Sequence, residues 1–147
     1  MIGLMVLRPG LPGVALAACV MFASPAFAET ISFKADLKAS EEVPPNDSKA
    51  MGTVTATYDT ASKKLTWKGN YSGLTGPATM AHFHGPAEPG KNAGVAVPIA
   101  PSASPFENSA NLTDAQAADL LAGRWYVNVH TGAHPGGEIR GQLVKGM

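Results

Sequence analysis

Seven short segments in which apolar and polar residues alternate restrict this chain to a small set of β folds. Successive side chains of a strand point to opposite faces, so alternation predicts a strand with one buried face. The segments are residues 31–37, 53–58, 64–71, 79–84, 95–99, 125–130 and 138–144. Their spacing and the turn residues between them predict one all-β domain, an antiparallel Greek-key-like sandwich or barrel of about seven to eight strands.

One short helix is predicted between the fifth and sixth segments. Thr113 is a suitable N-cap, and Gln116 stands three residues later, as in a capping box. Gly123 is placed to end the helix. The stretches 85–94 and 101–108 are rich in glycine, proline and small polar residues and predict irregular loops.

The first 28 residues have the pattern of a cleavable signal peptide. Arg8 precedes an apolar stretch that ends at Ala28, with small residues at the two positions that signal peptidase reads. Pro25 interrupts this stretch, which disfavours a membrane-spanning helix of about 20 apolar residues. The sequence therefore predicts a periplasmic or secreted domain of residues 29–147 with no membrane span. Cys19 ends a short lipoprotein-like box, so a lipid anchor at that residue is the alternative.

Cleavage after Ala28 would leave an almost neutral chain without cysteine. It removes Arg8, one of 11 basic residues, and none of the 11 acidic ones, which leaves a net charge of −1. This balance gives no electrostatic reason to bind nucleic acid. Because Cys19 is the one cysteine, the predicted mature domain has neither a disulfide nor thiolate chemistry. The sequence also lacks a serine elbow and a phosphate-binding glycine loop, which favours a binding protein over an enzyme.

The four histidines fall into two groups. His82 and His84 form a His-x-His pair on a predicted strand, so both rings lie on one face and can reach one ion. Met80 shares that face. His130 ends the strand at 125–130, and His134 lies in the loop that follows.

Matching core faces predicts how the last two strand segments pair. Val127 and Val129 on one segment, and the apolar residues of the segment 138–144, must face the core together. The simplest hairpin register places His130 opposite Glu138 and Asn128 opposite Arg140. The polar face then carries a histidine, a carboxylate, an amide and a guanidinium.

If the strand with His82 and His84 is a neighbour of this hairpin, three imidazoles meet on one sheet face. Imidazole suits copper and zinc, and affinity is highest for copper. The metal hypothesis therefore takes three residues as ligands, namely His82, His84 and His130. Met80 and His134 are candidate additional ligands, and Glu138 is expected to accept the second N–H of a ligating ring. Asn128 and Arg140 are further candidates for supporting the ligands from outside.

A purely structural interpretation of the same residues is the alternative. Histidines on an exposed strand face are often solvated polar residues, and Met80 can simply pack against its neighbours. Asn128, Glu138 and Arg140 would then form a hydrogen-bond and ion-pair network, and the loops 85–94 and 101–108 would carry contacts to a protein partner.

Five ordered segments resemble the CHRD (chordin-type) domain. They are AHFHGPA at 81–87, LT at 112–113, LAG at 121–123, YVNVHT at 126–131 and PGGEIRGQL at 135–143. The resemblance spans nearly all of residues 31–144 and implies an extracellular or periplasmic β-sandwich of the kind that stands alone in bacteria. In chordin, an extracellular antagonist of growth factors, the domain is repeated. The resemblance implies no established reaction, and growth-factor binding does not carry over because chordin's cysteine-rich modules are missing here.

A His-x-His on a β-sandwich is also similar to the arrangement in copper/zinc superoxide dismutase, by analogy of fold and motif alone. The dismutase pattern needs a bridging histidine, further zinc ligands and a disulfide. Four histidines and no mature cysteine cannot supply that two-metal arrangement. Redox chemistry at a single copper remains the minor alternative to metal binding alone.

Overall fold

The computed structural model describes residues 27–146. The predicted signal peptide lies almost wholly outside these residues, as does the alternative lipidation site Cys19. In the described part of the chain, no helix combines the length and the apolarity that crossing a membrane requires.

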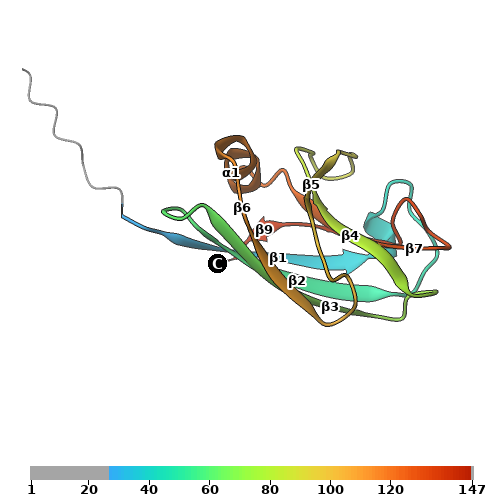
Figure 1. Cartoon of the computed structure of the whole chain (residues 1–147). Helices are drawn as coiled ribbons and strands as arrows, with labels where there is room; N and C mark the ends of the chain where they lie inside the picture. The colour runs from blue at the N-terminus through green and yellow to red at the C-terminus, as the bar shows by residue number, and fades with distance from the viewer. Residues whose placement is uncertain (1–26, 147) are drawn as a thin grey trace, which may run out of the picture.

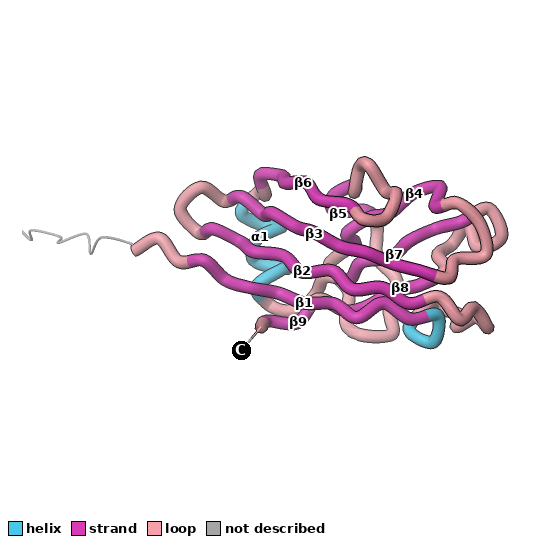
Figure 2. The backbone as a smooth tube through the Cα atoms, turned by 90° about the horizontal axis from the view of Figure 1, so that it is seen from below, coloured by secondary structure: helices cyan, strands magenta, loops and turns pink. Residues whose placement is uncertain are grey.

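Residues 27–146 form one nine-stranded sheet in which every pairing is antiparallel. The strands are β1 (Thr30–Lys38), β2 (Met51–Asp59), β3 (Lys64–Ser72), β4 (Ala78–His84), β5 (Val95–Pro98), β6 (Phe106–Asn111), β7 (Tyr126–Thr131), β8 (Ile139–Gln142) and β9 (Val144–Lys145). Their order across the sheet is β5-β4-β7-β8-β1-β2-β3-β6, with β9 beside β1. Figure 2 shows β1, β2 and β3 running side by side. The predicted all-β antiparallel class is confirmed.

The sheet curls into a nearly closed barrel, so that the inward side chains of all its parts share one core. The alternation seen in the sequence is the cause, because the apolar residue of each pair turns inward and the polar residue turns out. The core residues are Phe33, Ala35, Leu37, Ala39, Ala50, Val54, Ala56, Tyr58, Leu65, Trp67, Ala81, Phe83, Val97, Ile99, Phe106, Leu112, Ala117, Leu120, Trp125, Val127, Val129, Ile139 and Leu143.

Strand β6 was not predicted, because its sequence FENSAN has little β propensity and residues 101–108 were expected to be irregular. Residues 106–111 are extended because they pair with β3. Phe106 lies opposite Gly69, and its ring packs against the glycine backbone, where there is no side chain. The last predicted strand, 138–144, is instead divided at Leu143 into β8 and β9. There the Leu143 N–H bonds the Trp125 carbonyl, at 2.9 Å, between the two short strands.

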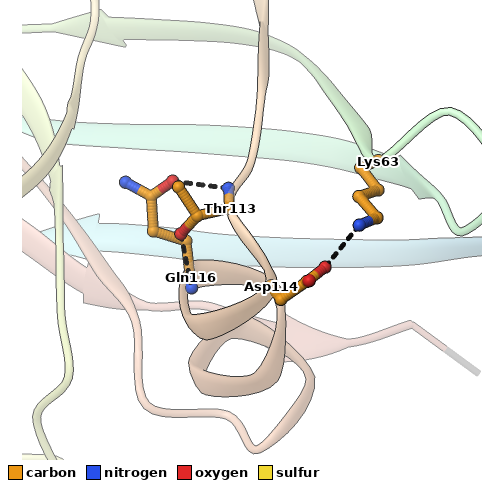
Figure 3. Close-up of polar contacts among 4 residues, drawn as sticks. All are labelled: Lys63, Thr113, Asp114 and Gln116. Carbon is orange, nitrogen blue, oxygen red and sulfur yellow. Dashed lines mark hydrogen bonds and ion pairs between the residues drawn. The ribbon is translucent and has the colours of Figure 1, made fainter.

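The predicted helix is confirmed as α1 (Asp114–Leu121), with the capping box of Thr113 and Gln116 formed in both directions (Figure 3). Asp114 in its first turn pairs with Lys63 of the β2–β3 turn. Gln116 has a second role, because its Nε2 donates to the Ala96 carbonyl of β5 at 3.0 Å. This bond ties the helix to β5, which is the strand at one end of the sheet (Figure 1).

Gly69 provides the first test of this packing. A Cβ at this position would lie 2.5 Å from Cζ of Phe106 and 2.9 Å from Cγ2 of Val54, closer than real contacts allow. We predict that Gly69→Ala lowers the free energy of unfolding by about 1–3 kcal/mol through overpacking, measured by urea denaturation. Gly76→Ala is the control, since nothing lies within 4 Å of its added Cβ. Equal stabilities of the two variants would contradict the packing described here.

Candidate metal centre

The histidines meet because β4, β7 and β8 are neighbours in the sheet. The predicted hairpin register is confirmed, with Asn128 opposite Arg140. On the other side of β7, Met80 lies opposite His130 and His82 lies opposite Asn128. Phe83 and Val127 turn into the core, which forces the histidines onto the opposite face of the sheet.

Three imidazoles form a compact cluster on this face. His82, His84 and His130 each offer one ring nitrogen, and these atoms all lie within 4.8 Å of one another. Nδ1 of His82 lies 3.2 Å from Nε2 of His130. His84 and His130 are only 8% and 6% exposed, while His82 is half-buried and forms the solvent side of the cluster.

Backbone carbonyls orient two of the rings. Nδ1 of His130 lies 2.9 Å from the Pro135 carbonyl oxygen, and Nδ1 of His84 lies 3.0 Å from that of Ala93. A carbonyl oxygen can only accept, so both Nδ1 atoms carry the proton and donate it. In the neutral rings the lone pairs are therefore on Nε2, the nitrogen with which His130 faces His82. The second N–H of a metal-bound histidine is commonly held in this way.

The environment favours the neutral form of His82 and of His84. Burial lowers the pKa of His82, and the neighbouring rings of His130 and His84 lower it further because cations would repel. Burial also lowers the pKa of His84, more than its bonds to Ala93 and Asn128 raise it. Metal ligation requires neutral imidazole, so both shifts favour the ligating form near neutral pH.

The loop 85–94 is fastened over this face by a stack of three side chains. His84 lies parallel to Tyr126, with ring centroids 4.8 Å apart, and the guanidinium carbon of Arg140 lies 3.4 Å from the centroid of the Tyr126 ring. Arg140 then donates to Oδ1 of Asn92 at 2.8 Å and to the Lys91 carbonyl. The loop thereby covers Tyr126 and Arg140, which are both buried.

Both carboxylate oxygens of Glu138 accept hydrogen bonds from groups other than a histidine ring, so the prediction that it orients a ligand is wrong. Its carboxylate accepts hydrogen bonds from the hydroxyls of Ser48, Thr75 and Thr131, at 2.6–2.8 Å, and from the Thr75 N–H at 2.9 Å. The side chain is fully buried. Glu138 thus joins three segments of the chain at the end of β7. The Pro135 carbonyl, and not Glu138, orients the ring of His130.

The two candidate additional ligands lie differently. Met80 is 48% exposed on β4, in register with His130, so its thioether borders the cluster on the solvent side. His134 is half-buried in the turn after β7, where its backbone N–H and C=O bond Thr131. The group of three ligand atoms does not include His134.

Glu42 was not predicted, although it is the second buried carboxyl beside this face, 4% exposed. It follows a short 3₁₀ turn, η1 (Ala39–Glu41), in a Glu-Glu-Val-Pro-Pro stretch that looks like solvent-exposed loop. Its Oε1 has no hydrogen-bond partner. Burial raises the pKa of Glu42 to about 7, against the lowering effects of the Arg140 charge, the Val43 N–H and Asn128. Only the tertiary fold brings these groups together.

Glu42 is expected to make stability fall as the pH rises. Its pKa is about 7 in the folded chain and 4.5 as the reference, so the folded protein binds the extra proton. Stability from this group is complete below pH 4.5 and is lost by about pH 7, a change of about 3 kcal/mol. We predict that Glu42→Gln removes this loss, seen as unfolding free energies measured from pH 5 to 8. Glu41→Gln, an exposed neighbour, should keep the pH profile of the unaltered protein. Parallel profiles for all three proteins would contradict this.

Glu138 is expected to act in the opposite direction. Burial alone would raise its pKa, but the hydrogen bonds from Ser48, Thr131 and Thr75 outweigh burial and lower the pKa to about 2. Its contribution to stability is present above pH 4.5 and is lost as the pH falls towards 2. We predict that Glu138→Gln lowers the free energy of unfolding at pH 7 by about 1.5–3 kcal/mol, the size of a hydrogen bond to a charged group, and that the difference narrows below pH 4.5, as measured by denaturation. A difference that is independent of pH would show that the charge is not involved.

The family model for the CHRD domain matches residues 33–143. This range includes β1 from its fourth residue, the three clustered histidines and the whole of β8. Neither the curated proteins nor the solved structures contain a match to this chain. Because the matched range covers well over half of the chain, and because its ordered motifs occupy the strands that build the cluster, the protein belongs to the CHRD domain family.

Proposed function

We propose that this protein is an exported metal-binding protein whose ligands are His82, His84 and His130. Copper is the proposed ion and zinc the alternative, because imidazole suits both and copper binds nitrogen ligands more tightly. Export to the periplasm or the medium is supported by the signal-like pattern of residues 1–28. The proposal is one of binding, and it assigns no reaction.

The observation that carries the proposal is the 3.2 Å separation of His82 Nδ1 and His130 Nε2. Two nitrogens that bind one tetrahedral ion at about 2.0–2.1 Å lie about 3.3 Å apart. The two rings thus already have the spacing of metal ligands. The proton that His82 donates across this contact would move to the other nitrogen of its ring, so an ion can enter with both rings neutral.

Burial and chemistry support the other features of the proposed site. The loops that cover His84 and His130 exclude water from two of the three ligands, and the sheet gives the rings a rigid platform. His82 leaves one side of the cluster open to solvent. Met80 borders the same side, and its thioether would favour copper(I).

Calorimetric titration of the purified, tag-free protein with copper(II) and with zinc(II) tests the proposal. We predict near-stoichiometric binding with submicromolar affinity for at least one ion. Both His82→Ala and His130→Ala should weaken that binding by more than about 100-fold, since even the outer partners of a ligating histidine contribute about 10–100-fold.

His134→Ala is the matched control, because this histidine lies in the turn after β7, outside the group of three. Its affinity should equal that of the unaltered protein. Binding that survives His82→Ala, or that falls equally with His134→Ala, would refute the ligand assignment. A protein that binds neither ion would favour the alternative function, an interaction module that contacts a partner through its loops.

A further inference from the structure

Both ring nitrogens of His84 are engaged within the protein. Nδ1 donates to the Ala93 carbonyl at 3.0 Å, and Nε2 lies 2.9 Å from Oδ1 of Asn128. Because Nδ1 carries the proton, Nε2 is the only nitrogen that a neutral His84 can offer to an ion. That nitrogen is already in a hydrogen-bond contact with Asn128.

The other two histidines are not restrained in this way. The facing nitrogens of His82 and His130 are bonded to each other, 3.2 Å apart. An ion that enters between them breaks this hydrogen bond, and both nitrogens then bind the ion instead of each other. An ion that also recruits His84 must separate its Nε2 from Asn128.

The contact between His84 and Asn128 is a hydrogen bond in either of two arrangements. A neutral Nε2 cannot accept from an amide oxygen, so either the ring carries a second proton or the Asn128 amide is turned with its NH2 group towards the ring. In both arrangements the Nε2 atom of His84 is engaged. The restraint therefore does not depend on which arrangement is present.

Asn128 is itself held firmly. It is 3% exposed, and its Nδ2 lies 3.5 Å from the Gly136 carbonyl oxygen. A Cβ at Gly137 would lie 2.3 Å from Oε1 of Glu42 and 2.7 Å from Nδ2 of Asn128, so both groups crowd the same bare backbone. The amide is fixed between His84 on one side and the Glu42–Gly137 contact on the other.

We propose that Asn128 is a positioning residue that restrains His84, so that a bound ion gains His84 as its third ligand, beside His82 and His130, only when the hydrogen bond between Asn128 and His84 breaks. The inference rests on the proposed metal-binding function and adds its regulation. Asn128 acts through His84 and is not itself a ligand. Its effect on affinity must therefore disappear when His84 is absent.

A double-mutant cycle on the full purified protein tests this, with zinc(II) affinity measured by competition against a chromophoric chelator. Asn128→Leu keeps the size of the side chain and removes its hydrogen bonds. We expect it to raise the affinity about tenfold, the equivalent of one hydrogen bond that no longer has to be broken. In the His84→Ala background the same change should have no effect. Asn128→Ala, which is too short to reach the ring, should give the same result if the leucine variant does not fold.

Gln142→Leu is the matched control for loss of a partly buried amide on this sheet, since its Nε2 bonds only the Ala87 and Gly123 carbonyls. It should leave zinc affinity unchanged. Lower affinity in both Asn128 variants, or an equal change with and without His84, would overturn the inference while the metal site stands. If the unaltered protein binds no zinc, both this inference and the proposed metal-binding function are overturned. A nitrogen NMR signal of His84 Nε2 that is identical in the protein and in Asn128→Leu would also contradict it without any metal present.

Discussion

The in-register pairing of β4, β7 and β8 is the constraint on which the candidate site depends. Each of these strands must turn its apolar residues into one barrel core, and a shift by one residue would expose all of them at once. The same requirement therefore fixes every polar residue on the opposite face. The cluster of His82, His84 and His130 is in this sense a product of core packing: hydrophobic burial on one side of the sheet supplies the free energy that holds polar groups together on the other.

Two buried carboxyl groups beside this face show how differently the fold can accommodate an acid. Glu138 is surrounded by hydroxyl and amide donors, so its charge is stabilised without a cation. Glu42 has an unpaired oxygen and lies near Arg140, whose guanidinium is already directed to the loop 85–94. Charge on Glu138 is thus favoured by folding, whereas charge on Glu42 is opposed by it. Such opposite environments a short distance apart are more typical of a polar site than of a plain surface.

Periodicity in the sequence was sufficient for the strands, the helix and the Asn128–Arg140 register, because each depends on short-range alternation or on capping chemistry. It failed for β6, whose polar residues form a strand only because β3 offers an edge and Gly69 leaves room for Phe106. The three histidines could be found from their positions on the strands. The partners of Glu138 could not, because two of them, Ser48 and Thr75, lie 90 and 63 residues away in the chain. The burial of Glu42 could not either, because this residue belongs to a loop that looks exposed. Long-range packing leaves no local pattern in the chain.

The use of main-chain oxygens to orient His84 and His130 has a consequence for how this domain can change over evolutionary time. Ala93 and Pro135 hold the rings through carbonyl groups, which every amino acid possesses. Replacing either side chain leaves the acceptor in place, so the identity of these loop residues is free to drift. The number of residues in each loop is not, because one insertion or deletion would move the carbonyl away from its ring. Selection on such a site would conserve the length of each loop and would leave its amino-acid composition free to vary.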